Sequence, residues 1–332
     1  MKVSKKAGIA LFVTTAVIMA VLIVFHKNPG PAADPGQELA KKIISCVVIA
    51  AACFAFIHWY DKFTGLPVEL FQNRHLIWKL AKNDFKKRYA GSYLGAVWAM
   101  AQPVVTVAMY YIVFDKIMGN TSTPLREGVE VPFVLFLTAG LVPWFYFSEA
   151  LNNGTNALLE YNYLVKKVVF KISILPIIKI IAATFIHVFF VLFMLFLFAL
   201  YGYYPGLHTL WVVYFSACLL IFVTGVCMLT SSLVIFFRDL TQIINIFLQV
   251  GIWMTPIMWS LEDLLAKYPI LMVLKLNPLC YIVYGYRAVL FQTGSVASLG
   301  WMNIYFWAVT IVTWIVGSGV FRRLKVHFAD VL

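Results

Sequence analysis

Charged residues are scarce in this chain of 332 residues. Asp, Glu, Lys and Arg together make up 12% of the sequence, about half of their share in a soluble globular protein. Hydrophobic residues make up 62%, and the mean hydropathy is +0.88. Because a soluble domain needs a wetted surface, this composition excludes a soluble single domain, and it also excludes intrinsic disorder. It predicts an all-α polytopic membrane protein.

Cysteines are few and odd in number, and their spacing is typical of neither a disulfide framework nor a metal site. Four of the five lie inside apolar runs, so we expect small buried side chains. The five are Cys46, Cys53, Cys218, Cys227 and Cys280.

Several catalytic signals are missing as well. All 14 acidic residues lie in loops or at the ends of apolar runs, so a proton relay through the membrane has no carboxylate. His187 is the only histidine in the middle of a span, and we expect it to pack rather than to relay protons. The sequence has no GxxxxGK(S/T) phosphate loop and no paired carboxylates suited to glycosyl transfer. We therefore expect no catalytic residue, metal or cofactor on this chain.

Apolar runs long enough to cross a membrane recur along the chain. A hydrocarbon core of about 30 Å is crossed by roughly 20 helical residues. One further stretch, 264–293, is interrupted by prolines and charged residues, so we expect a re-entrant helical pair there. The predicted spans are 7–25, 42–60, 93–115, 132–148, 174–200, 209–236, 242–260 and 301–321.

Lys and Arg are distributed unevenly over the segments between the spans. With the N-terminus inside, 18 of the 26 basic residues fall on inside segments, as the positive-inside rule requires of the cytoplasmic face. We attribute the net charge of +12 to this rule and expect no nucleic-acid partner. Both termini are then cytoplasmic, and 7–25 is expected to stay as a span rather than to be cleaved as a signal peptide.

The sequence divides into three parts. Residues 1–68 are expected to form a transmembrane hairpin, because the connection between its two spans is rich in proline and glycine. Residues 69–91 form a cytoplasmic amphipathic segment, and residues 92–332 carry six spans. No loop is long enough to hold a soluble catalytic domain.

An amphipathic helix is predicted over 72–89. One wide arc of the helical wheel is apolar and the opposite side is polar, while Arg74 and Asp84 interrupt the apolar arc. The apolar arc holds Leu76, Ile77, Trp78, Leu80, Ala81 and Phe85, and the polar side holds His75, Lys79, Lys82 and Asn83. Two interpretations stay open, namely an anchor on the cytoplasmic membrane surface and a lever that also contacts a cytosolic partner.

Two of the predicted spans carry polar and aromatic residues every three or four positions, on one face of each helix. Because such side chains are unfavourable against lipid, they should face protein or a cavity. Hydrogen bonds between helices and the lining of a transport path both fit, and amides with indoles favour a neutral hydroxylated substrate over an ion. The residues are Trp98, Gln102, Thr106 and Tyr110 in one span, and Gln242, Asn245, Gln249 and Trp253 in the other.

Glycine and proline add two local predictions to these spans. Gly91, Gly95 and Ala99 recur every four residues, which predicts close packing of the first core span against another helix. Thr255 and Pro256 follow the second polar face and should end or kink its helix.

The inside loop 148–171 is expected to present a docking surface. Residues 152–155 predict a turn that caps a short helix over 157–165, whose apolar and aromatic side chains would be exposed in the cytosol. Arg238 and Asp239 mark another inside loop, which is very short.

Four segments resemble the membrane subunit of type-2 ABC exporters, in particular the group that exports O-antigen, capsule and teichoic acid. They cover about 70–325 and occur in the same order and at the same topological positions. Similar proteins usually have Pro where this chain has Lys171, and they begin near residue 68, so the N-terminal hairpin is an addition. The segments are RYAGSYLGAVW at 88–98 with Pro103, GLVPW at 140–144, NYLVKK at 162–167 with Leu175-Pro176, and FRD at 237–239 with TPI at 255–257 and NP at 277–278.

The resemblance implies a homodimer of six-span subunits in the bacterial cytoplasmic membrane, with re-entrant helices at the outer side. Two copies of a cytosolic ABC ATPase would bind ATP and Mg²⁺, and a lipid-linked glycan would pass through the dimer interface. The implied gate-helix residues are Trp78, Lys82 and Lys86. The implied ATPase-coupling residues are Glu160, Tyr161, Asn162, Lys166, Arg238 and Asp239, and the implied channel residues are Trp98, Gln102, Thr106, Tyr110, Asn245, Gln249 and Trp253.

Two other functions stay open at this point. A type-2 permease for a small hydrophobic drug or lipid would need an enclosed apolar pocket, which the amide-rich faces do not favour. A membrane enzyme of glycan assembly would need catalytic carboxylates or a basic outer cleft, and neither is evident in the sequence.

Overall fold

The computed structural model describes residues 5–25, 42–43, 46–47, 49–50, 53–54, 57–58, 60–88, 90–91, 93, 95, 97–119, 122–126, 129–166, 171–265, 268–294 and 296–332. The chain forms two compact units, Met1–Gln72 and Asn73–Leu332. The first unit contains α1 (Lys5–Phe25) and α3 (Tyr60–Gln72). Helix α1 confirms the predicted helix 7–25, whereas much of the predicted span 42–60 and the loop before it lie outside the described residues.

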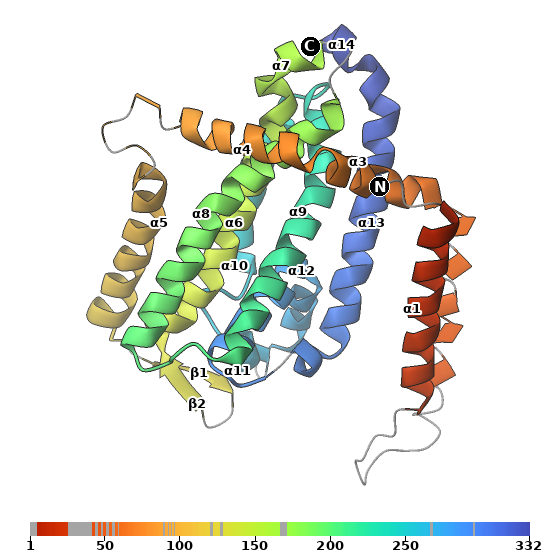
Figure 1. Ribbon diagram of the computed structural model, residues 1–332. Helices are drawn as coiled ribbons and strands as arrows, with labels where there is room; N and C mark the ends of the chain where they lie inside the picture. The colour runs from red at the N-terminus through yellow and green to blue at the C-terminus, as the bar shows by residue number, and fades with distance from the viewer. Residues whose placement is uncertain are drawn as a thin grey trace. The chain divides into compact units, whose positions relative to one another are not determined.

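The second unit is almost entirely helical and contains one short β-hairpin that the sequence did not predict (Figure 1). Strands β1 and β2 pair antiparallel, with Ser122 opposite Pro132 and Thr123 opposite Val131. The elements are α4 (Arg74–Arg88), α5 (Val97–Tyr110), the π-helix η1 (Tyr111–Ile117), β1 (Ser122–Arg126), β2 (Val129–Pro132), α6 (Phe133–Glu160), α7 (Asn162–Val165), η2 (Ile172–Ile174), α8 (Leu175–Leu200), η3 (Leu207–Leu210), α9 (Trp211–Val234), α10 (Leu240–Met254), α11 (Leu261–Leu265), η4 (Pro269–Leu276), α12 (Pro278–Leu290), η5 (Val296–Leu299), α13 (Trp301–Leu324), η6 (Lys325–His327) and α14 (Phe328–Val331).

Four of the described helices are long and apolar enough to cross a membrane. They correspond to the predicted spans 132–148, 174–200, 209–236 and 301–321. The predicted span 242–260 is only the 15-residue helix α10, because the chain leaves the helix at Thr255-Pro256. Helices η4 and α12 form a pair bent by 94°, which confirms that 264–293 does not cross as one straight helix.

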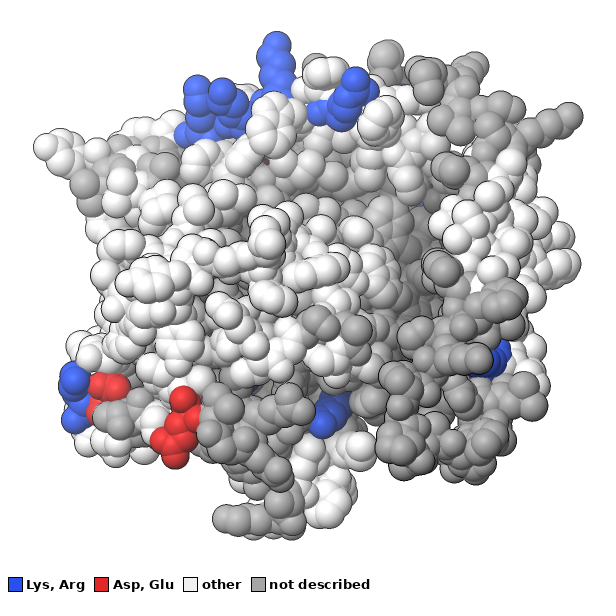
Figure 2. Space-filling model, turned by 60° about the horizontal axis from the view of Figure 1, so that its bottom comes forward, with Lys and Arg blue, Asp and Glu red and all other residues white. Residues whose placement is uncertain are grey.

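Figure 2 shows Lys and Arg side chains along the upper edge of one face, and Asp and Glu side chains at its lower left. The second unit also has two distinct ends (Figure 1). We call the end with α4, α7 and α14 the C-terminal end, and the end with β1, β2 and α11 the hairpin end.

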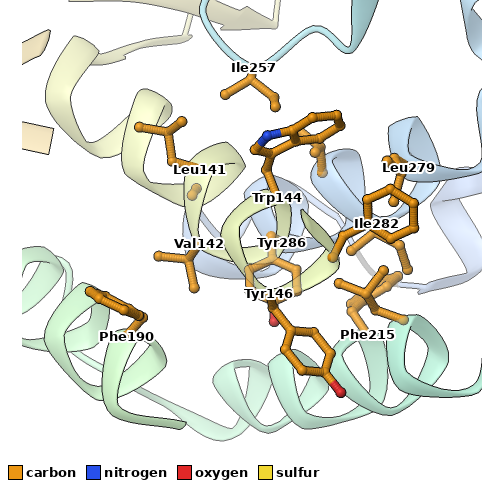
Figure 3. Packing of buried hydrophobic residues seen from close by; sticks show 14 of the residues in the cluster. Leu141, Val142, Trp144, Tyr146, Phe190, Phe215, Ile257, Leu279, Ile282 and Tyr286 are labelled. Atoms are coloured by element: carbon orange, nitrogen blue, oxygen red, sulfur yellow. The ribbon is translucent and has the colours of Figure 1, made fainter. Parts of the chain in front are cut away.

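Helix α6 is the centre of the second unit, and it packs on α8, α9, α10 and α12. Its side chains Leu135, Leu137, Ala139 and Leu141 are fully buried, so the first half of this helix is apolar all round and faces protein on every side. Figure 3 shows side chains from α6, α8, α9 and α12 converging around Trp144 and Tyr146 of α6.

The structure corrects the prediction of a turn at residues 152–155. Helix α6 continues without a break to Glu160, and Gly154 lies inside it. A Cβ atom at Gly154 would lie 2.5 Å from Cys227 Sγ of α9, so this glycine permits close helix packing instead of a turn. Only the four residues of α7 form a separate short helix.

The predicted packing role of Gly91 and Gly95 is also wrong. Both glycines precede α5 and have positive φ angles, of 84° and 54°. No atom lies within 4 Å of a Cβ built on either one. They provide the left-handed backbone that leads from α4 into α5, a conformation that glycine adopts without steric strain.

Candidate functional site

Helix α4 at the C-terminal end confirms the predicted helix, but its predicted apolar arc is buried only in part, because Leu76 is exposed. Its buried residues Ile77, Ala81 and Asp84 recur every three or four positions and face α8. Trp78 is 57% exposed, and the edge of its ring contacts Phe185 of α8 at 5.1 Å between centroids. The other two predicted gate-helix residues, Lys82 and Lys86, are exposed on α4.

Three charged side chains meet beneath α4. Lys179 Nζ of α8 lies 2.7 Å from Asp84 Oδ1 and 2.6 Å from Glu160 Oε2, at the end of α6. The Lys179 and Asp84 side chains are 7% and 9% exposed, whereas Glu160 is 50% exposed. Burial weakens the screening of such a pair, so removal of one partner is expected to be strongly destabilising. We call Asp84, Lys179, Glu160 and Tyr161 the α4 cluster.

Tyr161 is the uncharged member of the α4 cluster. Its hydroxyl donates a hydrogen bond to Asp84 Oδ1, and Lys179 Nζ lies 5.0 Å from the centroid of its ring. Burial raises the pKa of the Tyr161 phenol above its usual range, and the hydrogen bond to Asp84 adds to the rise. The phenol therefore stays protonated and remains a hydrogen-bond donor at neutral pH.

A second ion pair, between Arg88 and Glu149, lies next to the α4 cluster. Arg88, at the end of α4, donates a hydrogen bond to Glu149 of α6 and lies 3.9 Å from Asp84 Oδ2. Four chain segments are thus joined by charge, namely α4, the middle and the end of α6, and the start of α8. The sequence does contain a signal for this cluster, because a Lys inside an apolar span and an Asp on an apolar face both require partners.

The structure separates the six predicted coupling residues into two groups. Glu160 and Tyr161 bind inward, within the α4 cluster. The other four are exposed near the C-terminal end. Close to them, Thr241 Oγ1 at the start of α10 donates a hydrogen bond of 2.9 Å to Asn156 Oδ1 of α6. These four are Asn162 and Lys166 around α7, and Arg238 and Asp239 before α10.

The predicted channel residues of α5 are partly exposed. Trp98 is 55% exposed, whereas Thr106 and Tyr110 are half-buried. The Tyr110 ring lies 6.1 Å from the ring of Phe114 in η1. Gln102 belongs to α5, but its side chain lies outside the described part of the chain.

The predicted channel residues of α10 lie on the side that faces away from the core. Helix α10 packs on α6 and α9 through Ile244, Leu248 and Gly251. Asn245 is half-buried, Gln249 is exposed, and Trp253 is 60% exposed. Helix α5 packs on α6 and α8, and the described side chains of both polar faces stay partly or largely exposed, so among the described residues they do not enclose a path.

His187 packs in the core, as predicted. It is 4% exposed, its Nε2 lies 3.1 Å from Ser216 Oγ, and its ring stacks on Tyr146 at 4.4 Å. Among the described residues, no group of three or more His, Cys, Asp or Glu side chains is placed to hold a metal ion.

Comparison with known proteins gives one consistent result. The family described as "ABC-2 type transporter" matches residues 75–291. An "O-antigen export system permease protein RfbA" of Klebsiella pneumoniae is 28% identical over 255 residues, which cover 76% of this chain and 93% of that protein. A protein of the same description from Myxococcus xanthus is 28% identical over 266 residues, covering 79% and 97% of the two chains.

Proposed function

This chain belongs to the ABC-2 type transporter family, and we propose that it is the transmembrane subunit through which an ATP-driven exporter moves a lipid-linked polysaccharide of the O-antigen, capsule or teichoic-acid type. It is a multi-pass membrane permease related to O-antigen export permeases, and thus a transport component rather than an enzyme.

The α4 cluster is the observation that carries the proposal. It joins the amphipathic helix α4 to the turn between α6 and α7, next to exposed residues that suit a cytosolic partner. We assign Asn162, Lys166, Arg238 and Asp239 to direct contact with two copies of an ABC ATPase. ATP and Mg²⁺ bind on those ATPase chains. Glu160 and Tyr161 transmit the motion to α4, which serves as the gate helix together with Trp78, Lys82 and Lys86.

The exposed faces of α5 and α10 support a homodimer. Trp98, Gln249 and Trp253 lie on surfaces that one chain leaves open, so a second copy is needed to enclose a path. Aromatic and amide side chains bind sugars by stacking and by hydrogen bonds without a net charge. This chemistry agrees with the substrate in the names of the relatives. The proposed path also includes Gln102, Thr106, Tyr110 and Asn245.

We place both termini and the C-terminal end of the second unit on the cytoplasmic side of the bacterial inner membrane. The excess of Lys and Arg on the inside segments supports this orientation. The hairpin end, with the bent pair η4–α12 as the re-entrant element, then faces outward. Residues 92–332 form the six-span export domain, residues 69–91 form the gate segment, and residues 1–68 form an added transmembrane hairpin.

The decisive experiment measures ATP hydrolysis by this chain co-purified with its cognate ATPase in lipid nanodiscs. We expect lipid-linked glycan to stimulate hydrolysis, and Trp98→Ala to abolish the stimulation while the ATPase stays bound. Trp301→Ala, which removes an exposed tryptophan outside the proposed path, is the matched control. Absence of an ATPase partner, or alteration of the glycan by the chain alone, would contradict the proposal.

Cysteine cross-linking tests the dimer separately. Val105 on α5 and Val250 on α10 are 58% and 51% exposed. We expect Val105→Cys and Val250→Cys on separate chains to cross-link across two copies. Leu192→Cys, which is exposed on α8, is expected to give no cross-link.

A further inference from the structure

Arg287 of α12 is a buried cation without an acidic partner. The residue is 3% exposed, and no Asp or Glu among the described residues forms an ion pair with it. A charge buried in this way is unfavourable unless dense hydrogen bonding compensates it, and an apolar residue of similar size would often pack at lower cost. Its presence therefore calls for a role that an apolar side chain cannot serve.

Backbone carbonyl groups take the place of the missing carboxylate. Nη1 donates to the carbonyl oxygen of Pro256 at 2.6 Å, and Nη2 donates to that of Ile257 at 2.6 Å. Nε and Nη2 both donate to the carbonyl of Phe136 in α6, at 3.3 and 3.2 Å. The guanidinium also lies 3.3 Å from the centroid of the Phe136 ring.

These acceptors identify what Arg287 holds in place. Pro256 and Ile257 follow Thr255, the residue that ends α10, so their carbonyl groups lie outside the helix and have no helical partner there. Phe136 lies in the first turns of α6. One side chain of α12 therefore joins the end of α10 to the start of α6. A planar guanidinium suits this task because it directs several N–H groups outward at once.

Gly140 of α6 gives the arginine its space. A Cβ atom at this position would lie 3.2 Å from Arg287 Nη2 and 3.1 Å from Ile257 Cγ2. A larger residue would push both the guanidinium and the chain after α10 away from α6. The glycine of the GLVPW segment thus belongs to the same arrangement.

A second connection between α12 and α10 lies at the start of α12. The Asn277 side chain caps α12 by accepting from Leu279 N at 3.0 Å, and its Nδ2 donates to Thr255 Oγ1 at 2.9 Å. Trp259 Nε1 closes the same end of α10 by donating to the carbonyl of Trp253 at 3.1 Å. Trp253, the last of the proposed path-facing residues on α10, lies immediately before this fixed end of the helix.

We propose that Arg287 is a positioning residue for export, which fixes the Met254 end of α10 to α6 and α12 so that these three elements move as one body. The path then opens by movement of this body and not by unwinding of residues 254–257. The inference rests on the proposed function, because it assigns the path-facing role to α10.

The test compares Arg287→Met with Lys116→Met in the complex with the cognate ATPase in nanodiscs. Lys116 is a 63% exposed cation in η1 whose ion pair is with its neighbour Asp115 in the same helix, so its loss removes the same charge without releasing that contact between helices. We expect Arg287→Met to raise the ATP hydrolysed per glycan exported about tenfold, with the ATPase still bound, and Lys116→Met to match the parent. Arg287→Lys should be intermediate, because an ammonium lacks the planar fork.

Cys280 provides a readout that does not depend on transport. It is fully buried in α12, and its Sγ donates to the carbonyl of Leu274 at 3.1 Å. In a chain whose other four cysteines are alanine, we expect Arg287→Met to accelerate labelling of Cys280 by a water-soluble maleimide. Parent-like coupling together with slow labelling would overturn the proposal.

Gly140→Ala is the second variant in case Arg287→Met fails to assemble. It retains the arginine and shifts it, so the same loss of coupling and faster labelling are expected. A parent-like Gly140→Ala chain would then refute the positioning role. If the parent complex itself shows no glycan-dependent hydrolysis, the proposed function fails, while the labelling of Cys280 still reports whether Arg287 holds α12 in place.

Discussion

Lys179 Nζ lies 2.7 Å from Asp84 Oδ1, in a site where both side chains are less than one-tenth exposed. The two residues are 95 positions apart in the chain. This contact attaches the amphipathic helix α4 to the long helix α8. Glu160 and Tyr161 complete the cluster from the end of α6, so a displacement at that turn changes the surroundings of α4 directly.

Removal of Lys179 should be the most destabilising single change in the α4 cluster. Lys179→Met leaves Asp84 and Glu160 without their shared cation, and we expect a loss of about 3 kcal/mol in the free energy of unfolding. Thermal unfolding of the purified chain in nanodiscs measures the loss. Lys82→Met, on the exposed face of α4, is the control and should unfold like the parent.

A double substitution tests whether Asp84 and Lys179 act as a pair. Asp84→Asn combined with Lys179→Met removes the unpaired buried charge at Asp84, so the two losses should not add. We expect the double variant to be more stable than the sum of the single changes by about 1–2 kcal/mol. Additive losses in the unfolding measurements would show that the contact has no energetic role.

The two groups of predicted coupling residues should respond differently to substitution. Asn162→Ala with Arg238→Ala should weaken binding of the cognate ATPase about tenfold, a difference of about 1.4 kcal/mol, without changing thermal stability. Tyr161→Phe should instead lower stability, because buried Asp84 loses a hydrogen bond of about 1.5–3 kcal/mol. Binding titrations and unfolding curves distinguish the groups. The proposed division is wrong if both variants lose ATPase binding or if both lose stability.

Gly154 should tolerate no larger residue while Cys227 faces it. We expect Gly154→Ala to destabilise the chain by about 1–3 kcal/mol, since its Cβ would overlap Cys227 Sγ. The double variant with Cys227→Ala should recover part of the loss, because only the cysteine Cβ remains, at 3.1 Å. Gly319→Ala in α13, where no atom lies within 4 Å, is the control and should be neutral in the same unfolding assay.

The sequence by itself was sufficient for many features that depend on composition and on period along the chain, although not for the repeat of Gly91 and Gly95. Scarce charge and long apolar runs predicted the membrane helices, because lipid accepts only segments whose backbone is internally bonded. The spacing of Ile77 and Ala81 predicted the buried face of α4, and the interrupted run at 264–293 predicted the bent pair. The family resemblance depended on short motifs in order, which matching to ABC-2 type transporters confirmed.

Only the tertiary structure decided which residues meet. Gly154 has the sequence surroundings of a turn, yet it lies inside α6 because α9 packs closely there. Asp84 and Arg287 look out of place in apolar segments, and their partners are far away in sequence: a lysine on α8 for one, backbone carbonyls after α10 and in α6 for the other. Such pairings depend on the distance between helices and on burial. A one-dimensional pattern shows that a buried charge needs a partner, but only the folded chain specifies which one.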